Sequence, residues 1–238
     1  MEWTDAHVHI GDDAGGASGD LDEIDAFMVD GTIDRAVVFC MDERDGIPAG
    51  NDRVRETVAG RDDLAGLFRI DPSVHDPADL RDREAFAGYK MHPRAQDFGM
   101  QEVYRHLEAI ADEGKPVIIH TGVGDGSRMH PEDILETASV HRDVDIVLAH
   151  NAKGYVFHAD GFREALGDLD NAYMDISLHC TPFGVEMLVD DLGADHVLFA
   201  SDYPYGHPAP MRQNVELADI TEDEREMVAG GTADRLFF

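Results

Sequence analysis

The first residues read MEWTDAHVHIGDD, and the fold is decided by DAHVHI at residues 5–10. This apolar run carries His7 and His9 two residues apart, which in a β-strand turns both imidazoles to the same face. Two imidazoles placed in this way can bind one metal ion. Because the same spacing also occurs in strands that bind nothing, the metal interpretation depends on further ligands elsewhere in the chain.

Seven more short apolar runs follow, each separated from the next by a loop and usually by a helical pattern. Several show no alternation of polar and apolar residues, as is typical of strands buried on both faces. The eight expected strands cover residues 3–9, 35–40, 64–70, 87–92, 116–120, 145–150, 172–176 and 196–200.

Helices are expected at residues 20–30, 100–114, 130–141 and 181–193, with a weak pattern at 78–83 and a closing helix within 221–238. Eight strands with interleaved helices predict an α/β fold, a single (β/α)₈ TIM barrel. The 238 residues make a compact and slightly short barrel of one domain, residues 1–238. The alternative is a doubly wound open sheet, but no G-x-G-x-x-G motif follows the first strand.

Acidic residues dominate the composition, with 50 Asp and Glu against 19 Lys and Arg and a formal net charge of −31. The acids are spread along the chain, a pattern typical of halophilic proteins that stay soluble at high salt. Such a field disfavours nucleic-acid partners. No apolar run long enough to span a membrane and no signal-peptide pattern is visible, so we expect a cytoplasmic protein without membrane contact. Homo-oligomer formation is left open.

The predicted strand ends carry a group of metal-binding side chains. Barrel enzymes place their chemistry at the carboxyl ends of the strands. The side chains expected there include His7, His9, His92, His120, His150 and Asp202. Histidines with one aspartate suit a divalent ion, most simply Zn²⁺. We expect His7, His9, His120 and Asp202 as ligands, with His150 and Asp202 as the catalytic residues and His150 taking or returning a proton.

Five segments stand out in chain order between residues 5 and 204: DAHVHI, GYKMHP, KPVIIHTG, VLAHN and LFASDYP. Together they resemble the amidohydrolase superfamily, in the metal-dependent TIM-barrel branch that includes aminocarboxymuconate-semialdehyde decarboxylase. The resemblance implies a metal held by His7, His9, His120 and Asp202, with His150 in the catalytic position. The segment HNAKGY departs from the glycine-rich continuation common in the family.

Lys90 and His92 share one face of the fourth expected strand. We expect them to bind a substrate carboxylate or to orient the site. In two-metal members of the superfamily a lysine of this strand is carboxylated, so a second metal is an alternative, with His150 then a ligand. A third alternative is a structural lysine buried against an acid.

Further residues lie near the predicted mouth of the barrel. Asp175 either orients a metal ligand or is an ordinary strand-end residue. His179 and Cys180 are candidates for substrate contact, and Tyr203 and Tyr205 for a wall of the pocket.

These patterns favour a metal-dependent hydrolase that uses a metal-activated water on a small amide, ester or lactone. The first alternative is a nonoxidative decarboxylase of a small carboxylic acid, working at the same site. The second is a non-catalytic metal-binding protein. In each enzymatic case the partner is a small-molecule substrate, and the absence of G-x-S-x-G argues against a serine hydrolase.

Overall fold

Strands and helices alternate along the chain in the computed structural model, which describes residues 1–41, 45–80, 84–122, 128–178 and 180–238, apart from the side chains at 79, 153 and 160. The strands are β1 (Thr4–Asp12), β2 (Ser18–Gly19), β3 (Arg35–Cys40), β4 (Leu64–Ile70), β5 (Gly88–Met91), β6 (Val117–Ile119), β7 (Ile146–Leu148), β8 (Ala172–Asp175) and β9 (Val197–Leu198). The α-helices are α1 (Leu21–Val29), α2 (Ile47–Val58), α3 (Met100–Ile110), α4 (Pro131–Val140), α5 (Asp160–Gly167), α6 (Pro182–Leu192), α7 (Pro208–Leu217), α8 (Glu222–Glu226) and α9 (Thr232–Phe237). Short 3₁₀ segments cover Pro77–Asp79, Ala111–Glu113, Ala149–His158 and Ala194–His196, and a π-helical turn covers Met227–Gly231.

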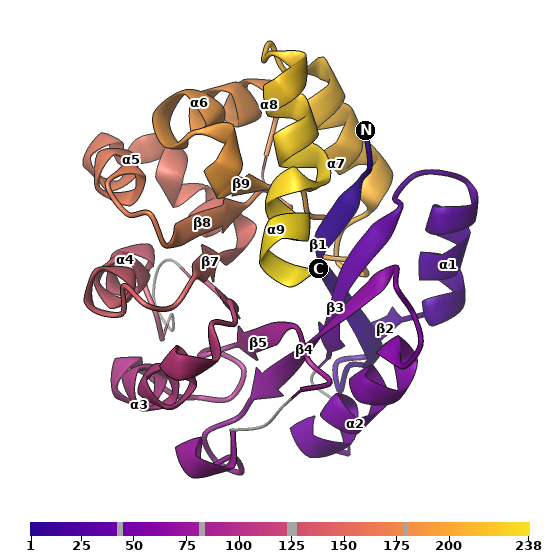
Figure 1. Ribbon diagram of the computed structural model, residues 1–238, viewed down its shortest axis with the longest axis vertical. Helices are drawn as coiled ribbons and strands as arrows, with labels where there is room; N and C mark the ends of the chain where they lie inside the picture. The colour runs from indigo at the N-terminus through magenta and orange to yellow at the C-terminus, as the bar shows by residue number, and fades with distance from the viewer. Residues whose placement is uncertain (42–44, 81–83, 123–127, 179) are drawn as a thin grey trace.

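Within the described residues these strands form one curled sheet in the order β2-β1-β3-β4-β5-β6-β7-β8-β9 (Figure 1). Every neighbouring pair is parallel except β1 and β2, which are antiparallel. Each of the eight expected strand positions contains a strand. The two-residue β2 was not predicted, because Ser18 and Gly19 carry no apolar signal.

Backbone hydrogen bonds also connect β1 with the segment after β9. The Ala6 amide donates to the Phe199 carbonyl at 3.0 Å, and the Asp202 amide donates to the His7 carbonyl at 2.9 Å. The His9 amide donates to the Tyr203 carbonyl at 2.8 Å. The first and last strand regions therefore lie side by side, and this brings the two ends of the sequence to one site.

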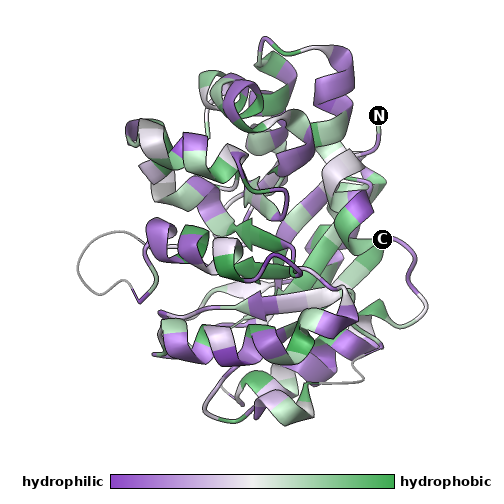
Figure 2. Ribbon diagram, turned by 60° about the vertical axis from the view of Figure 1, so that its left-hand side comes forward, coloured by the Kyte–Doolittle hydropathy of each residue, from purple (hydrophilic) through white to green (hydrophobic). Residues whose placement is uncertain are grey.

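Successive side chains of most strands alternate between two apolar clusters. On β4, Leu64 and Phe68 pack outward in a cluster that also holds buried residues of helices α1 to α7. Ala65 and Leu67 belong to an inner cluster, to which other strands contribute residues such as Phe39 and Ile118. Figure 2 shows the strands as the apolar centre and the helices with mixed polar and apolar faces. Burial of both strand faces explains the uninterrupted apolar runs in the sequence.

The inner face changes from apolar to polar toward the carboxyl ends of the strands. Continuing the alternation on β4 past Leu67 brings Arg69 to the inner face, and Lys90 pairs with Arg69 in the register of β5. Both are almost fully buried, at 1% and 0% exposure. Arg69 and Lys90 therefore lie next to the inner apolar cluster, toward the carboxyl ends of the strands.

Helix α9 covers the other end of this interior. Ala233 and Phe237 join the inner apolar cluster, and the Thr4 hydroxyl donates to Asp234 Oδ1 at 2.7 Å. The closing helix expected within residues 221–238 is thus divided into α8, a π-helical turn and α9.

The expected helices at 20–30, 100–114, 130–141 and 181–193 are all present as α1, α3, α4 and α6. The weak pattern at 78–83 corresponds to one 3₁₀ turn, Pro77–Asp79, and residues 81–83 lie outside the described part of the chain. Cys40 and Cys180 are free and buried. In the described residues, no helix has the length and apolar character needed to cross a bilayer.

Because Phe237 fills the inner cluster, we expect Phe237→Ala to lower the free energy of unfolding by about 3–5 kcal/mol. Phe238, the adjacent residue of the same type, is 47% exposed, whereas Phe237 is 5% exposed. The matched control Phe238→Ala should therefore lower it by less than about 1 kcal/mol. Denaturant unfolding at high salt measures both, and equal losses would contradict the role assigned to α9.

Candidate metal centre

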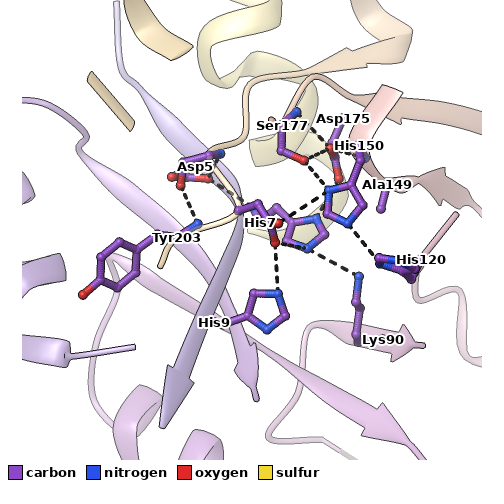
Figure 3. Close-up of polar contacts among 12 residues, drawn as sticks. Asp5, His7, His9, Lys90, His120, Ala149, His150, Asp175, Ser177 and Tyr203 are labelled. Carbon is purple, nitrogen blue, oxygen red and sulfur yellow. Dashed lines mark hydrogen bonds and ion pairs between the residues drawn. The ribbon is translucent and has the colours of Figure 1, made fainter. Parts of the chain in front are cut away.

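Donor atoms of His7 and His9, on β1, approach a carboxylate oxygen of Asp202, which lies near the other end of the sequence. Figure 3 shows the two histidine rings with His150 and Lys90 near them. His7 Nε2 lies 3.2 Å and His9 Nε2 lies 3.1 Å from Asp202 Oδ1. All three residues are buried, and their donor atoms lie within 4.8 Å of one another. Asp202 has a left-handed backbone conformation, φ 61°, and lies four residues after the end of β9.

This donor set fits a divalent metal ion. Ligands bound tetrahedrally at about 2.1 Å from an ion lie about 3.4 Å apart, close to the donor separations seen here. Two imidazole nitrogens and a carboxylate oxygen are common ligands of such ions. His7, His9 and Asp202 could therefore hold a divalent ion together, and their role as ligands stays a prediction.

Asp175 orients His7 from behind. His7 Nδ1 lies 2.7 Å from Asp175 Oδ2, and neither side chain is exposed. Burial alone would raise the pKa of Asp175, but the charge of His7 and its hydrogen bond lower that pKa below its usual range. An ionised Asp175 accepts a hydrogen bond from Nδ1–H of His7. In a neutral His7, Nε2 is then the atom that can bind a metal. This contact supports the interpretation of Asp175 as a residue that orients a metal ligand, and not as an ordinary strand-end residue.

The charges of the centre are arranged so that a metal ion competes with a proton. Burial and Lys90 lower the pKa of His7, but Asp175 and Asp202 outweigh them and raise it. Burial lowers the pKa of His9 to about 4, so His9 is neutral at pH 7. Burial opposes ionisation of Asp202, yet its contacts with His7 and His9 lower its pKa. Any proton on His7 Nε2 has to leave before that atom can bind a metal ion.

Hydrogen bonds also connect His150, through Ser177, to Asp175. Its Nδ1 lies 2.8 Å from Ser177 Oγ, and the Ser177 hydroxyl donates to Asp175 Oδ1 at 2.6 Å. The His150 amide also donates to Asp175 Oδ1. Because the serine proton is used on Asp175, Ser177 accepts from His150 Nδ1–H, and Nε2 of His150 carries the free lone pair in the neutral ring. Burial holds the pKa of His150 well below its usual value.

His120 lies beside His150 and is not in the group formed by His7, His9 and Asp202. Its Nδ1 is 3.0 Å from His150 Nε2, and its ring stacks on His92 with centroids 3.7 Å apart. His120 as a fourth ligand therefore stays a prediction. The metal-binding groups found in the described residues are His7, His9 and Asp202, and a second one of His7, His150 and Asp175.

A cavity of about 270 Å³ opens beside the centre. Its lining residues are His9, Arg69, His92, His120, His150, Leu178, Asp202 and Tyr205. His92, expected to contact substrate, and Tyr205, expected as a wall, both line it. Tyr205 packs edge-on against His9, and its hydroxyl bonds to Asp13 Oδ2 at 3.1 Å, connecting two loops at the mouth.

Lys90 is not among the residues that line the cavity, and it lies beneath the metal-binding atoms. Its Nζ is 3.5 Å from His7 Nε2 and 4.8 Å from the centroid of the Phe39 ring. A metal ion and a protonated Lys90 would therefore compete for the same lone pair. Substrate binding by Lys90 and its carboxylation both stay predictions.

Sequence reasoning missed Arg69 and Ser177. Arg69 lies between two apolar residues in LFRID, where its inward direction follows only from the alternation along β4. Ser177 has no distinguishing sequence signal. His179, a candidate for substrate contact, lies outside the described residues, and Cys180 is buried with its pKa raised to about 12 by burial.

The sequence matches the model of the amidohydrolase family over residues 4–238. No protein of curated function matches it. The match to the family model covers nearly the whole chain.

Among solved structures, 5-carboxyvanillate decarboxylase from Sphingomonas paucimobilis superposes with a TM-score of 0.77 at 19% identity, covering 100% of this chain and 99% of that chain. A 2,6-dihydroxybenzoate decarboxylase from Rhizobium gives 0.78 at 14% identity, covering 100% and 98%. A dihydroxybenzoic acid decarboxylase from Polaromonas sp. JS666, with bound manganese and the inhibitor 2-nitroresorcinol, gives 0.75 at 14% identity, covering 99% and 96%.

These comparisons correct the expected reaction. The expectation of a hydrolase acting on an amide, ester or lactone is wrong, because the named enzymes among these structures are decarboxylases. The error has a physical cause. A metal held by histidines and an aspartate can act as a Lewis acid in either reaction, so the ligand motifs do not separate the two.

We expect the purified protein to bind about one divalent ion per chain, and His9→Gln to weaken that binding by more than about 100-fold, since even residues behind the ligands contribute 10–100-fold. The control is His158→Gln, which removes an exposed histidine. Metal analysis after equilibrium dialysis against Mn²⁺ or Zn²⁺ measures both. Unchanged binding by His9→Gln would contradict the site, and two ions per chain would favour a carboxylated Lys90.

Proposed function

The chain belongs to the amidohydrolase family, and on that basis we propose that it is a metal-dependent, nonoxidative decarboxylase of a small carboxylic acid. The observation that carries the proposal is the convergence of His7, His9 and Asp202 at the wall of a small cavity that His150 also lines. The decarboxylase structures with the same fold support this reaction, and one of them binds manganese.

We also propose that the curled sheet closes into the eightfold barrel expected from the sequence. The backbone bonds between β1 and residues 199–203, with the parallel bridge between Val8 and Tyr203, support closure. Closure would bring the ligands on β1 and after β9 next to each other in the sheet. His120 remains our candidate for a fourth ligand, and its half-buried ring would have to leave His150 to reach the ion.

When bound, a divalent ion supplies positive charge that binds substrate oxygens and withdraws electrons from the carbon that loses CO₂. His7, His9 and Asp202 would hold this charge beside the cavity, and Asp175 keeps the His7 ring oriented. The donor set suits Zn²⁺, whereas a similar structure carries manganese, so both ions belong in the tests.

His150 is the proton carrier in this proposal. The bond between the substrate carbon and its carboxyl group breaks, the electron pair stays on carbon, and CO₂ leaves. Nε2 of the neutral His150 ring takes up a proton from solvent and delivers it to that carbon, which forms the new C–H bond and leaves the ring neutral again. Ser177 and Asp175 hold Nδ1, so that Nε2 is the atom available for this transfer.

The reaction is tested by incubating the metal-loaded protein at high salt with small aromatic and enoic acids, starting with 2,6-dihydroxybenzoate and 5-carboxyvanillate. We expect CO₂ release and, in D₂O, one deuterium at the carbon that lost it. Hydrolysis of amides, esters or lactones with no CO₂ from any acid would contradict the proposal.

His150→Asn should keep the bound metal and lower kcat by about 10²–10⁴-fold, since the side chain moves a proton without being a ligand in the proposed site. Metal content and CO₂ release are measured on the same sample. Full activity in this variant would remove His150 from the mechanism, and loss of metal would make it a ligand.

A further inference from the structure

Leu178 is an aliphatic side chain in a cavity wall that is otherwise polar or aromatic. Among the described residues, the others that line this cavity are four histidines, an arginine, an aspartate and a tyrosine. Leu178 is half-buried, and neither the metal centre nor the proton transfer uses it. Apolar groups in a ligand cavity contact the carbon skeleton of the ligand, whereas the polar groups fix its orientation.

The backbone of Leu178 has a conformation that leucine rarely adopts. Its φ is 65°, in the left-handed region where the Cβ atom crowds the following carbonyl oxygen. Glycine would adopt this conformation without that crowding, so the turn itself does not require leucine. Residues held in this way are concentrated at catalytic and binding sites, where the surroundings fix them. The side chain of Leu178 therefore has a use that its backbone does not explain.

The residue before Leu178 holds the proposed proton carrier. The Ser177 amide and hydroxyl donate to Asp175 Oδ1 at 3.1 and 2.6 Å. Ser177 Oγ also lies 2.8 Å from His150 Nδ1. The position of Leu178 is thus tied to that of the His150 ring, which lines the same cavity.

The other side of Leu178 packs against the turn that follows the proposed metal ligand Asp202. The Gly206 amide donates to the Asp202 carbonyl at 3.0 Å. A Cβ atom added to Gly206 would lie 3.2 Å from Leu178 Cδ2, so the leucine side chain fills the space next to this glycine. Leu178 is therefore fixed to both groups that act on the substrate in the proposed mechanism, and the carbon skeleton of that substrate comes within its reach.

The cavity is small enough for one side chain to limit what enters it. Its volume is about 270 Å³. Cavities that bind drug-sized ligands measure about 300–1,000 Å³. In a closely fitting apolar pocket, one methylene group changes the preference between two ligands by about 10–200-fold. The isobutyl group of Leu178 is larger than one methylene group.

We infer that Leu178 sets the size limit of the substrate by packing on the edge of its carbon skeleton, beside the carbon that His150 protonates. The substrate is then an acid with a single small ring or a short unsaturated chain. A second fused ring at that edge would overlap the leucine side chain. The inference rests on the proposed decarboxylase function and specifies the substrate class of the same site.

The test measures the binding of benzoate, 1-naphthoate and 2-naphthoate to the Mn²⁺-loaded protein by calorimetry at fixed high salt. The wild-type protein should bind benzoate more than about 10-fold more tightly than either naphthoate. Leu178→Ala should bring at least one naphthoate within about 3-fold of benzoate, and should weaken benzoate binding by about 3–10-fold because apolar contact is lost. The matched control Leu217→Ala, at a 65% exposed leucine of α7, should keep the wild-type ratios.

A second variant separates substrate contact from a purely structural role. Leu178→Gly should change the binding ratios in the same direction as Leu178→Ala. It should lower the melting temperature less than Leu178→Ala does, because glycine adopts a φ of 65° without strain. A leucine that only stabilises the fold would give a lower melting temperature in both variants and unchanged binding ratios.

Four results would overturn the inference. They are equal binding of benzoate and both naphthoates by the wild-type protein, no benzoate binding at all, ratios that survive both variants, and an equal loss of all three probes in the variants. If neither variant folds, a crystal structure of the wild-type protein with benzoate decides. A ring carbon must lie within about 4.5 Å of the Leu178 side chain, and a ring bound elsewhere overturns the inference.

The size limit and the decarboxylase proposal fail separately. Binding is measured without turnover, so unchanged ratios in the variants count against the role of Leu178 alone. Absence of CO₂ release in a protein that shows the expected ratios counts against the decarboxylase proposal alone.

Discussion

The contact between His7 Nδ1 and Asp175 Oδ2, 2.7 Å long and fully buried, is the interaction on which the candidate site depends. It joins β1 to β8, and it decides which nitrogen of His7 faces Asp202. The same carboxylate holds the His150 amide and, through Ser177, the His150 ring. One buried aspartate therefore orients both His7, the proposed metal ligand, and His150, the proposed proton carrier, and loss of its charge would disorder both rings together.

The fold makes this concentration of polar groups possible by separating two kinds of interior. Residues such as Leu67 and Ile118 fill the inner face below, and α9 covers that end through Phe237. Above them, alternation along the same strands presents Arg69 and Lys90. The apolar layers supply the burial free energy that allows charged side chains to be held out of water above them. The site is thus built on the strands and on the segments that follow them, where His150 and Asp202 have left-handed backbone conformations.

Much of this arrangement could be predicted from the sequence. The strand positions followed from apolar runs, and His7, His9 and Asp202 from the rule that strand ends converge. The contacts made by His120 could not be predicted, because a ring at a strand end can face either the ion or its neighbours. Arg69 was missed because it lies inside an apolar run, and Ser177 because a serine has no periodic signal. The reaction was predicted wrongly, since the metal ligands are shared by hydrolases and decarboxylases.

The position of the bound metal ion is the most direct test, and anomalous diffraction from crystals of the Mn²⁺-loaded protein measures it. We predict one strong peak within bonding distance of His7 Nε2, His9 Nε2 and Asp202 Oδ1, with Asp175 still bonded to His7 Nδ1. A peak at other residues, or an intact contact between Lys90 and His7 Nε2 with no ion at the three donors, would contradict the central claim.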